Sequence, residues 1–169
     1  MLNKLSATKK GVITGLAMVA LSLVFVLLKK QPTGLPQYLA YIIYTAGVVW
    51  TLLSFHKKNV AILKENQAPL TFKPYFSEGF KCFIVVTLLM VIYTFVFFKI
   101  DHTYQNAMAD QLRQDLVKTG NATPAEIDKQ VSSMKANFAL LYTAGAVFFY
   151  LFIGTLVTAV TGAFLTSKK

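Results

Sequence analysis

Residues 82–98 read CFIVVTLLMVIYTFVFF, and no charged side chain interrupts these 17 residues. Three further runs of the same kind are Gly11–Leu28, Pro36–Phe55 and Phe138–Thr166. A helix needs about 17–25 apolar residues to cross the hydrocarbon core of a membrane. The sequence therefore predicts an all-α integral membrane protein, a bundle of four transmembrane helices. The predicted spans are about 11–28, 36–55, 80–99 and 138–166.

Composition supports this assignment over the whole chain of 169 residues, which we expect to form a single membrane domain. Hydrophobic residues make up 55% and charged residues 14%, whereas a soluble domain carries about 25% charged residues. The net charge is +10, but the lysines cluster beside the apolar runs instead of forming a basic binding face. We therefore expect no nucleic-acid partner.

The distribution of basic residues predicts the orientation of the chain. Four spans place the N-terminus, the loop 56–81 and the C-terminus on one side, which then carries ten lysines against seven basic residues on the other. Basic residues concentrate on the cytoplasmic side of membrane proteins. We expect both termini to be cytoplasmic, and we expect membrane lipid, including anionic headgroups, as a partner of the basic side.

The connection between the third and fourth spans, about residues 100–137, reads as an extracytoplasmic helical hairpin. Thr123–Pro124–Ala125–Glu126 is a capping box with proline in the first helical position. Gly120 and Asn121, just before it, tolerate the left-handed conformation that ends a helix. The third and fourth helices are thus expected to extend outward as two antiparallel arms.

Both arms carry apolar residues at helical spacing, which predicts that they pack against each other. The first stripe is Ile100, Tyr104, Met108, Leu112 and Leu116, and the second is Ile127, Val131, Met134 and Phe138. Charged residues between the stripes suggest weak ion pairs three positions apart, such as Asp110 with Arg113.

At the base of this hairpin, apolar side chains require a cover. The candidate partner surface comprises Phe138, Leu141, Tyr142, Ile100 and Tyr104. The facing arm, the loop after the first span, lipid headgroups or another protein could each supply the cover. An apolar patch left exposed would indicate an interaction site.

Small residues recur every four positions in two of the spans. These candidate helix-packing residues are Gly11 and Gly15 in the first span and Gly154, Thr158 and Gly162 in the fourth. Such ridges let helices approach closely in lipid. They predict packing within the chain or, alternatively, a homo-oligomer.

No catalytic, metal-binding or cofactor-binding group is recognisable. The four apolar runs contain no Asp, Glu, His, Lys or Arg. Ion and proton pathways usually require such side chains within the membrane. The two histidines, His56 and His102, fall on opposite sides of the membrane by this topology. We therefore expect no enzyme, no metal site and no cofactor.

Several features, in order along the chain, resemble a family of small bacterial inner-membrane proteins classed as a domain of unknown function. They are the lysine-rich ends, Phe76–Ser77–Glu78–Gly79–Phe80 at the entry to the third span, Asp101 after it, and the turn Gly120–Glu126. The resemblance implies a four-span topology and a bacterial source, and it implies no activity.

The preferred functional hypothesis is a non-enzymatic membrane protein that serves as an accessory or interaction subunit of a cell-envelope complex. Its partner would be another protein or a second copy of the chain. A small-solute or lipid transporter is the alternative, and a membrane enzyme is the third possibility.

Overall fold

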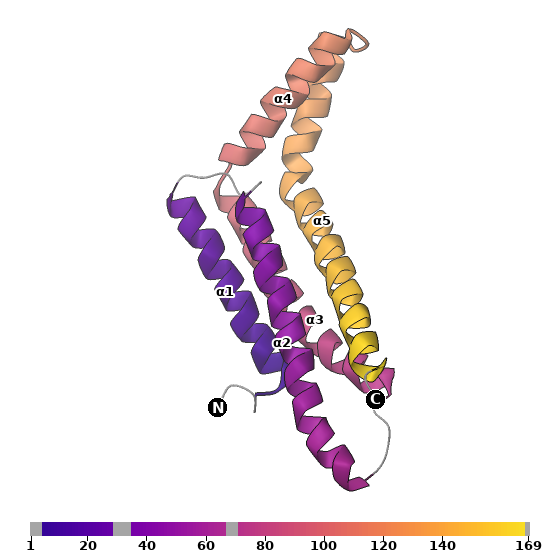
Figure 1. The fold of residues 1–169 in the computed structure, drawn as a ribbon. Helices are drawn as coiled ribbons and strands as arrows, with labels where there is room; N and C mark the ends of the chain where they lie inside the picture. Colours follow the sequence, from indigo (N-terminus) through magenta and orange to yellow (C-terminus); the bar gives the residue numbers. More distant parts are fainter. Residues whose placement is uncertain (1–4, 29–34, 67–70, 168–169) are drawn as a thin grey trace. The chain divides into compact units, whose positions relative to one another are not determined.

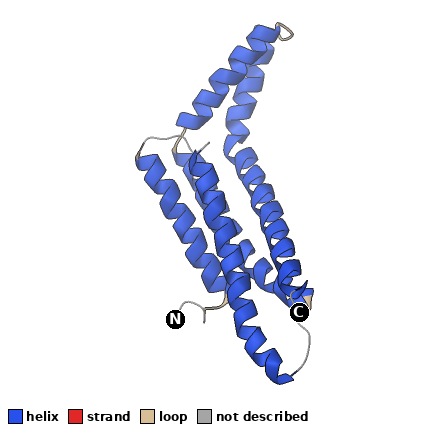
Figure 2. Ribbon diagram, viewed as in Figure 1, coloured by secondary structure: helices blue, strands red, loops and turns tan. Residues whose placement is uncertain are grey.

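The computed structural model describes residues 5–28, 35–66 and 71–167, and nearly all of these residues are helical (Figure 2). The helices are α1 (Ala7–Leu27), α2 (Leu35–Asn66), α3 (Phe72–Ile100), α4 (Thr103–Thr119) and α5 (Pro124–Ser167). The described part of the chain contains no β-strand. The all-helical fold class is therefore confirmed.

Four of these helices, α1, α2, α3 and α5, are long and apolar enough to cross a membrane, which is consistent with a multi-pass membrane protein. The helices extend beyond the predicted spans: α2 continues to Asn66 and α3 begins at Phe72. Charged residues end an apolar run, but Lys and Glu are good helix formers and do not end a helix.

The chain divides into two compact units, which we describe separately (Figure 1). The four-helix unit comprises Met1–Met90 and Val147–Lys169, and the hairpin unit comprises Val91–Ala146. Within the four-helix unit, α1 and α2 lie side by side. The first residues of α1 and the last residues of α5 lie at the same end of this unit.

Polar contacts between apolar helices fix the interior of the four-helix unit. The Tyr44 hydroxyl of α2 donates a hydrogen bond of 2.7 Å to the backbone carbonyl of Tyr150 in α5, and the two rings meet edge to face. Nearby, Thr51 donates to the carbonyl of Gly47 and lies 3.3 Å from the buried sulfur of Cys82. Each bond satisfies a polar group that water cannot reach.

The hairpin unit contains α4 and the first part of α5, which run antiparallel on either side of a tight turn (Figure 1). One expectation is corrected here: α3 does not continue into the first arm. The Asp101 side chain accepts the backbone N–H of Thr103 at 2.8 Å, and the helix is interrupted at Asp101 and His102. Aspartate competes with the backbone in this way and favours helix starts over helix interiors.

Candidate functional site in the hairpin unit

The hairpin has a small hydrophobic core of its own. Ala109 of α4 and Ile127 and Val131 of α5 are buried together, and partly buried apolar side chains surround them. These surrounding residues are Leu112, Leu116, Ala122 and Met134. Both predicted stripes therefore face each other over most of their length. Ala109 was not predicted, because a lone alanine carries no hydrophobic signal among stronger ones.

An aromatic cluster closes the other end of the hairpin. Phe98, Tyr104, Phe138 and Tyr142 are all in mutual contact, with ring centroids between 4.3 and 6.0 Å apart. Most of these pairs are edge to face, the arrangement that the ring quadrupoles favour. The cluster joins the end of α3, the start of α4 and the middle of α5 within this unit.

Polar contacts hold the two arms together at the surface. The Gln105 amide donates to the backbone carbonyl of Lys135, whose ammonium in turn donates to Asn106 at 2.9 Å. Arg113 pairs with Asp128 across the hairpin at 2.6 Å, and not with Asp110 as predicted. The sequence carries no signal for this choice, because it depends on the register of α4 against α5.

The turn between the arms follows the predicted chemistry. Gly120 ends α4 in the left-handed region, with φ of 65°. The Thr123 backbone N–H donates to the Glu126 carboxylate at 2.7 Å, and the Glu126 N–H donates back to the Thr123 hydroxyl at 3.4 Å. The hydrogen bonds from the Thr123 backbone and hydroxyl lower the pKa of Glu126. The Thr103 hydroxyl and amide likewise lower the pKa of Asp101.

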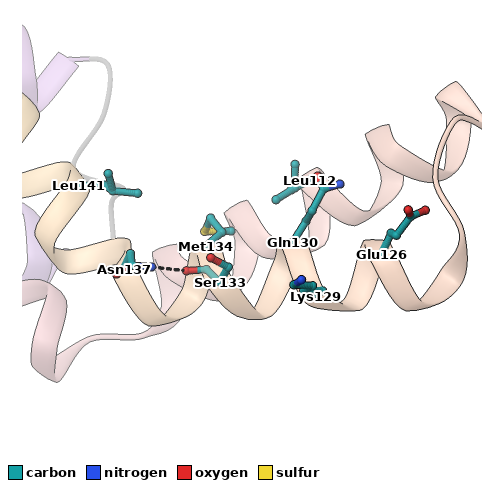
Figure 3. Close-up of a pocket in the computed structure, with 8 residues that line it drawn as sticks. All are labelled: Leu112, Glu126, Lys129, Gln130, Ser133, Met134, Asn137 and Leu141. Atoms are coloured by element: carbon teal, nitrogen blue, oxygen red, sulfur yellow. Dashed lines mark hydrogen bonds between the residues drawn. The ribbon is translucent and has the colours of Figure 1, made fainter.

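A groove of about 570 Å³ runs along one face of the hairpin (Figure 3). Leu112 of α4 and the apolar Met134 and Leu141 of α5 line it together with polar side chains of α5. The polar residues are Glu126, Lys129, Gln130, Ser133 and Asn137. This mixture of apolar and hydrogen-bonding groups suits a binding surface. Of the residues that line the groove, only Leu141 was predicted from the sequence to lie on the candidate partner surface.

The structure separates the five residues of the candidate partner surface. Leu141 and Ile100 are 60% and 76% exposed, while Tyr104 and Tyr142 are half-buried. Phe138 is only 1% exposed, because the three other rings of the aromatic cluster enclose it, so the chain itself supplies the cover at this residue. The exposure of Ile100 follows from the interruption of the helix directly after it.

The small residues of the four-helix unit lie against neighbouring helices. A side chain added at Gly11 or Gly15 would collide with Cys82 or Leu89 of α3. One added at Gly154 would collide with Tyr44 and Phe83. Thr158 faces Gly79, and Gly162 lies against Phe72 and Tyr75. Both ridges thus make contacts inside this unit.

The polar side chains of the described residues are not arranged as a metal site requires, and those of the hairpin unit line a surface groove. Among residues 5–28, 35–66 and 71–167, no group of three His, Cys, Asp or Glu side chains is placed to hold a metal ion. In the hairpin unit, Asp101 and Glu126 accept hydrogen bonds at helix starts, and Arg113 pairs with Asp128 at the surface. Its groove offers amide, hydroxyl and charged groups to a partner.

Comparison with known proteins places the chain in a family. No curated protein and no solved structure matches it. A family model described as protein of unknown function (DUF4199) matches residues 9–167. The matched range includes the whole hairpin and all five helices, apart from the first two residues of α1. The chain therefore belongs to the DUF4199 family.

Proposed function

We propose that this protein is a non-enzymatic accessory subunit of a cell-envelope complex in a bacterial inner membrane, and that it binds another protein through the groove of its hairpin unit. The single observation that carries the proposal is the groove itself. The arms already share a core, so the exposed Leu141, Ser133 and Asn137 of the groove are not needed to close the hairpin. Exposed apolar surface next to hydrogen-bonding groups is typical of interaction sites.

Charge favours a different protein over a second copy as the partner. Two copies in one membrane are related by a twofold axis along the membrane normal, and such a contact brings the same surface patch of each copy together. If they met at the groove, Lys129 would face Lys129 and Glu126 would face Glu126. A partner helix with the opposite charges at these two positions would avoid the repulsion.

A photocrosslinking amino acid in place of Ser133 or Ser132 tests the proposal. These neighbours are both exposed, but only Ser133 lines the groove. In native membranes, we expect a crosslink to one protein of different mass from position 133 and none from position 132. Equal crosslinking from both positions, or a product of twice the chain's own mass, would contradict the proposal.

The proposed orientation, with both termini in the cytoplasm, is supported by the excess of lysine on that side. Fusing alkaline phosphatase, which is active only outside the cytoplasm, to the C-terminus or to the turn at Asn121 tests it. We expect activity only from the fusion at the turn. Activity from the C-terminal fusion would reverse the orientation.

A further inference from the structure

Lys10 is buried, although it is a charged residue in the first turn of α1. Its side chain is only 2% exposed, and its ammonium lies over the ring of Trp50 in α2, 5.1 Å from the centroid. The two helices lie side by side in the four-helix unit (Figure 1). A cation within about 6 Å of a tryptophan face is held there by the ring quadrupole.

The ring leaves most of the hydrogen-bonding capacity of Lys10 unused. An ammonium has three N–H donors, and it requires oxygen acceptors when it is removed from water. Among the described residues, the two ion pairs are Lys81–Glu78 and Arg113–Asp128, so Glu78, the acid whose charge reaches Lys10, is already paired. The Lys10 ammonium makes no hydrogen bond to the described residues, yet it is not one of the fully enclosed polar atoms, so a small part of its surface is open to a ligand from outside the chain.

The surroundings of Lys10 attract an anion for a second, independent reason. The start of α1 carries the positive end of the helix dipole, and no acidic residue occupies its first turn. Lys9 stands beside Lys10 and is exposed. Three sources of positive potential therefore converge near Lys10, and among the described residues the acid whose charge reaches it, Glu78, belongs to another pair.

We propose that Lys10 binds a phosphate oxygen of an anionic phospholipid, with Trp50 as the residue that positions its ammonium. Phosphate offers the acceptors that the ammonium lacks, and a net negative lipid has no internal cation to compete for them. Ile13, which is exposed one turn further along α1 and lies on the neighbouring face, would contact an acyl chain of the same lipid. This site is separate from the groove of the hairpin unit.

Native mass spectrometry of the purified full-length protein tests the assignment. The protein is mixed with phosphatidylglycerol or with phosphatidylcholine, and the lipid retained at each concentration is counted. We expect the unmodified protein to retain phosphatidylglycerol more tightly, and Lys10→Gln to lose roughly tenfold or more of that affinity, as for loss of a charge-assisted hydrogen bond. Lys9→Gln, the matched control one residue away, is expected to change it by less than about threefold.

Two further measurements decide the outcome if Lys10→Gln yields no folded protein. Trp50→Leu keeps the lysine and removes the ring, so it should also weaken phosphatidylglycerol retention several-fold. Inorganic phosphate in millimolar excess should not displace the lipid, because it lacks acyl chains. Equal retention of both lipids by the unmodified protein, equal effects of the two lysine variants, unchanged retention in Trp50→Leu, or displacement by inorganic phosphate would each overturn the proposal.

Discussion

Replacing Phe138 by alanine should open the hairpin unit. The side chain is 1% exposed and contacts three other rings, so the substitution removes almost its whole buried area. Phe→Ala in a core costs about 3–5 kcal/mol. We expect about 3 kcal/mol, at the lower end of that range, because the half-buried rings of Tyr104 and Tyr142 can move partly into the space.

Hydrogen–deuterium exchange of the protein in nanodiscs measures this effect. A loss of about 3 kcal/mol lowers the protection of peptides from α4 roughly 100-fold, provided that they exchange by opening of the hairpin. Leu140→Ala is the matched control, since Leu140 lies two residues away and is 63% exposed. Similar loss of protection in both variants would refute the reasoning, as would unchanged protection in Phe138→Ala.

Three further predictions concern single contacts. Gly154→Ala places a methyl group against Tyr44 and Phe83 and should lower the free energy of unfolding by about 1–3 kcal/mol, measured by thermal unfolding in detergent. Gly145→Ala on the same helix is the control, and it should be neutral or stabilising because the space at its Cβ is open. Equal shifts in unfolding temperature would count against this packing. Tyr44→Phe removes a hydrogen bond to α5 and should lower the free energy of unfolding by about 0.6 kcal/mol in the same assay, a typical value within membranes. An unchanged unfolding temperature would show that this hydrogen bond does not stabilise the protein. Because the pKa of Glu126 is lowered in the folded hairpin, its contribution to stability is present above the ordinary pKa of glutamate and is lost as the pH falls through the folded-state value. Glu126→Gln should therefore remove part of the acid-induced loss of protection at the start of α5, and an unchanged pH profile would exclude this role.

Much of the fold could be predicted because it depends on local chemistry. The uncharged run at residues 82–98 requires a long apolar helix, and the Thr123–Glu126 capping box requires a helix start, whatever the rest of the chain does. The burial of Ile127 and Val131 required only that a second helix face them, and the turn at Gly120 brings α4 into that position.

The candidate site could be predicted only in part, since it depends on register and on competition between groups. The helix is interrupted at Asp101 because its carboxylate accepts a hydrogen bond from the backbone N–H of Thr103. Ile100, just before the interruption, is exposed. The pairing of Arg113 with Asp128 requires knowing which turn of α4 faces which turn of α5. The burial of Lys10 over Trp50 was likewise hidden, because a lysine at the edge of a span reads as an orientation signal.

Cys82 of α3 is the only cysteine of the chain, and its buried sulfur lies against Thr51 of α2. Its thiol is shielded from water-soluble maleimides while the protein is folded. Cysteines introduced at exposed positions such as Lys118 or Lys57 would therefore be labelled selectively, without first removing the natural one. The native sequence thus serves directly as a background for mapping which residues each side of a membrane can reach.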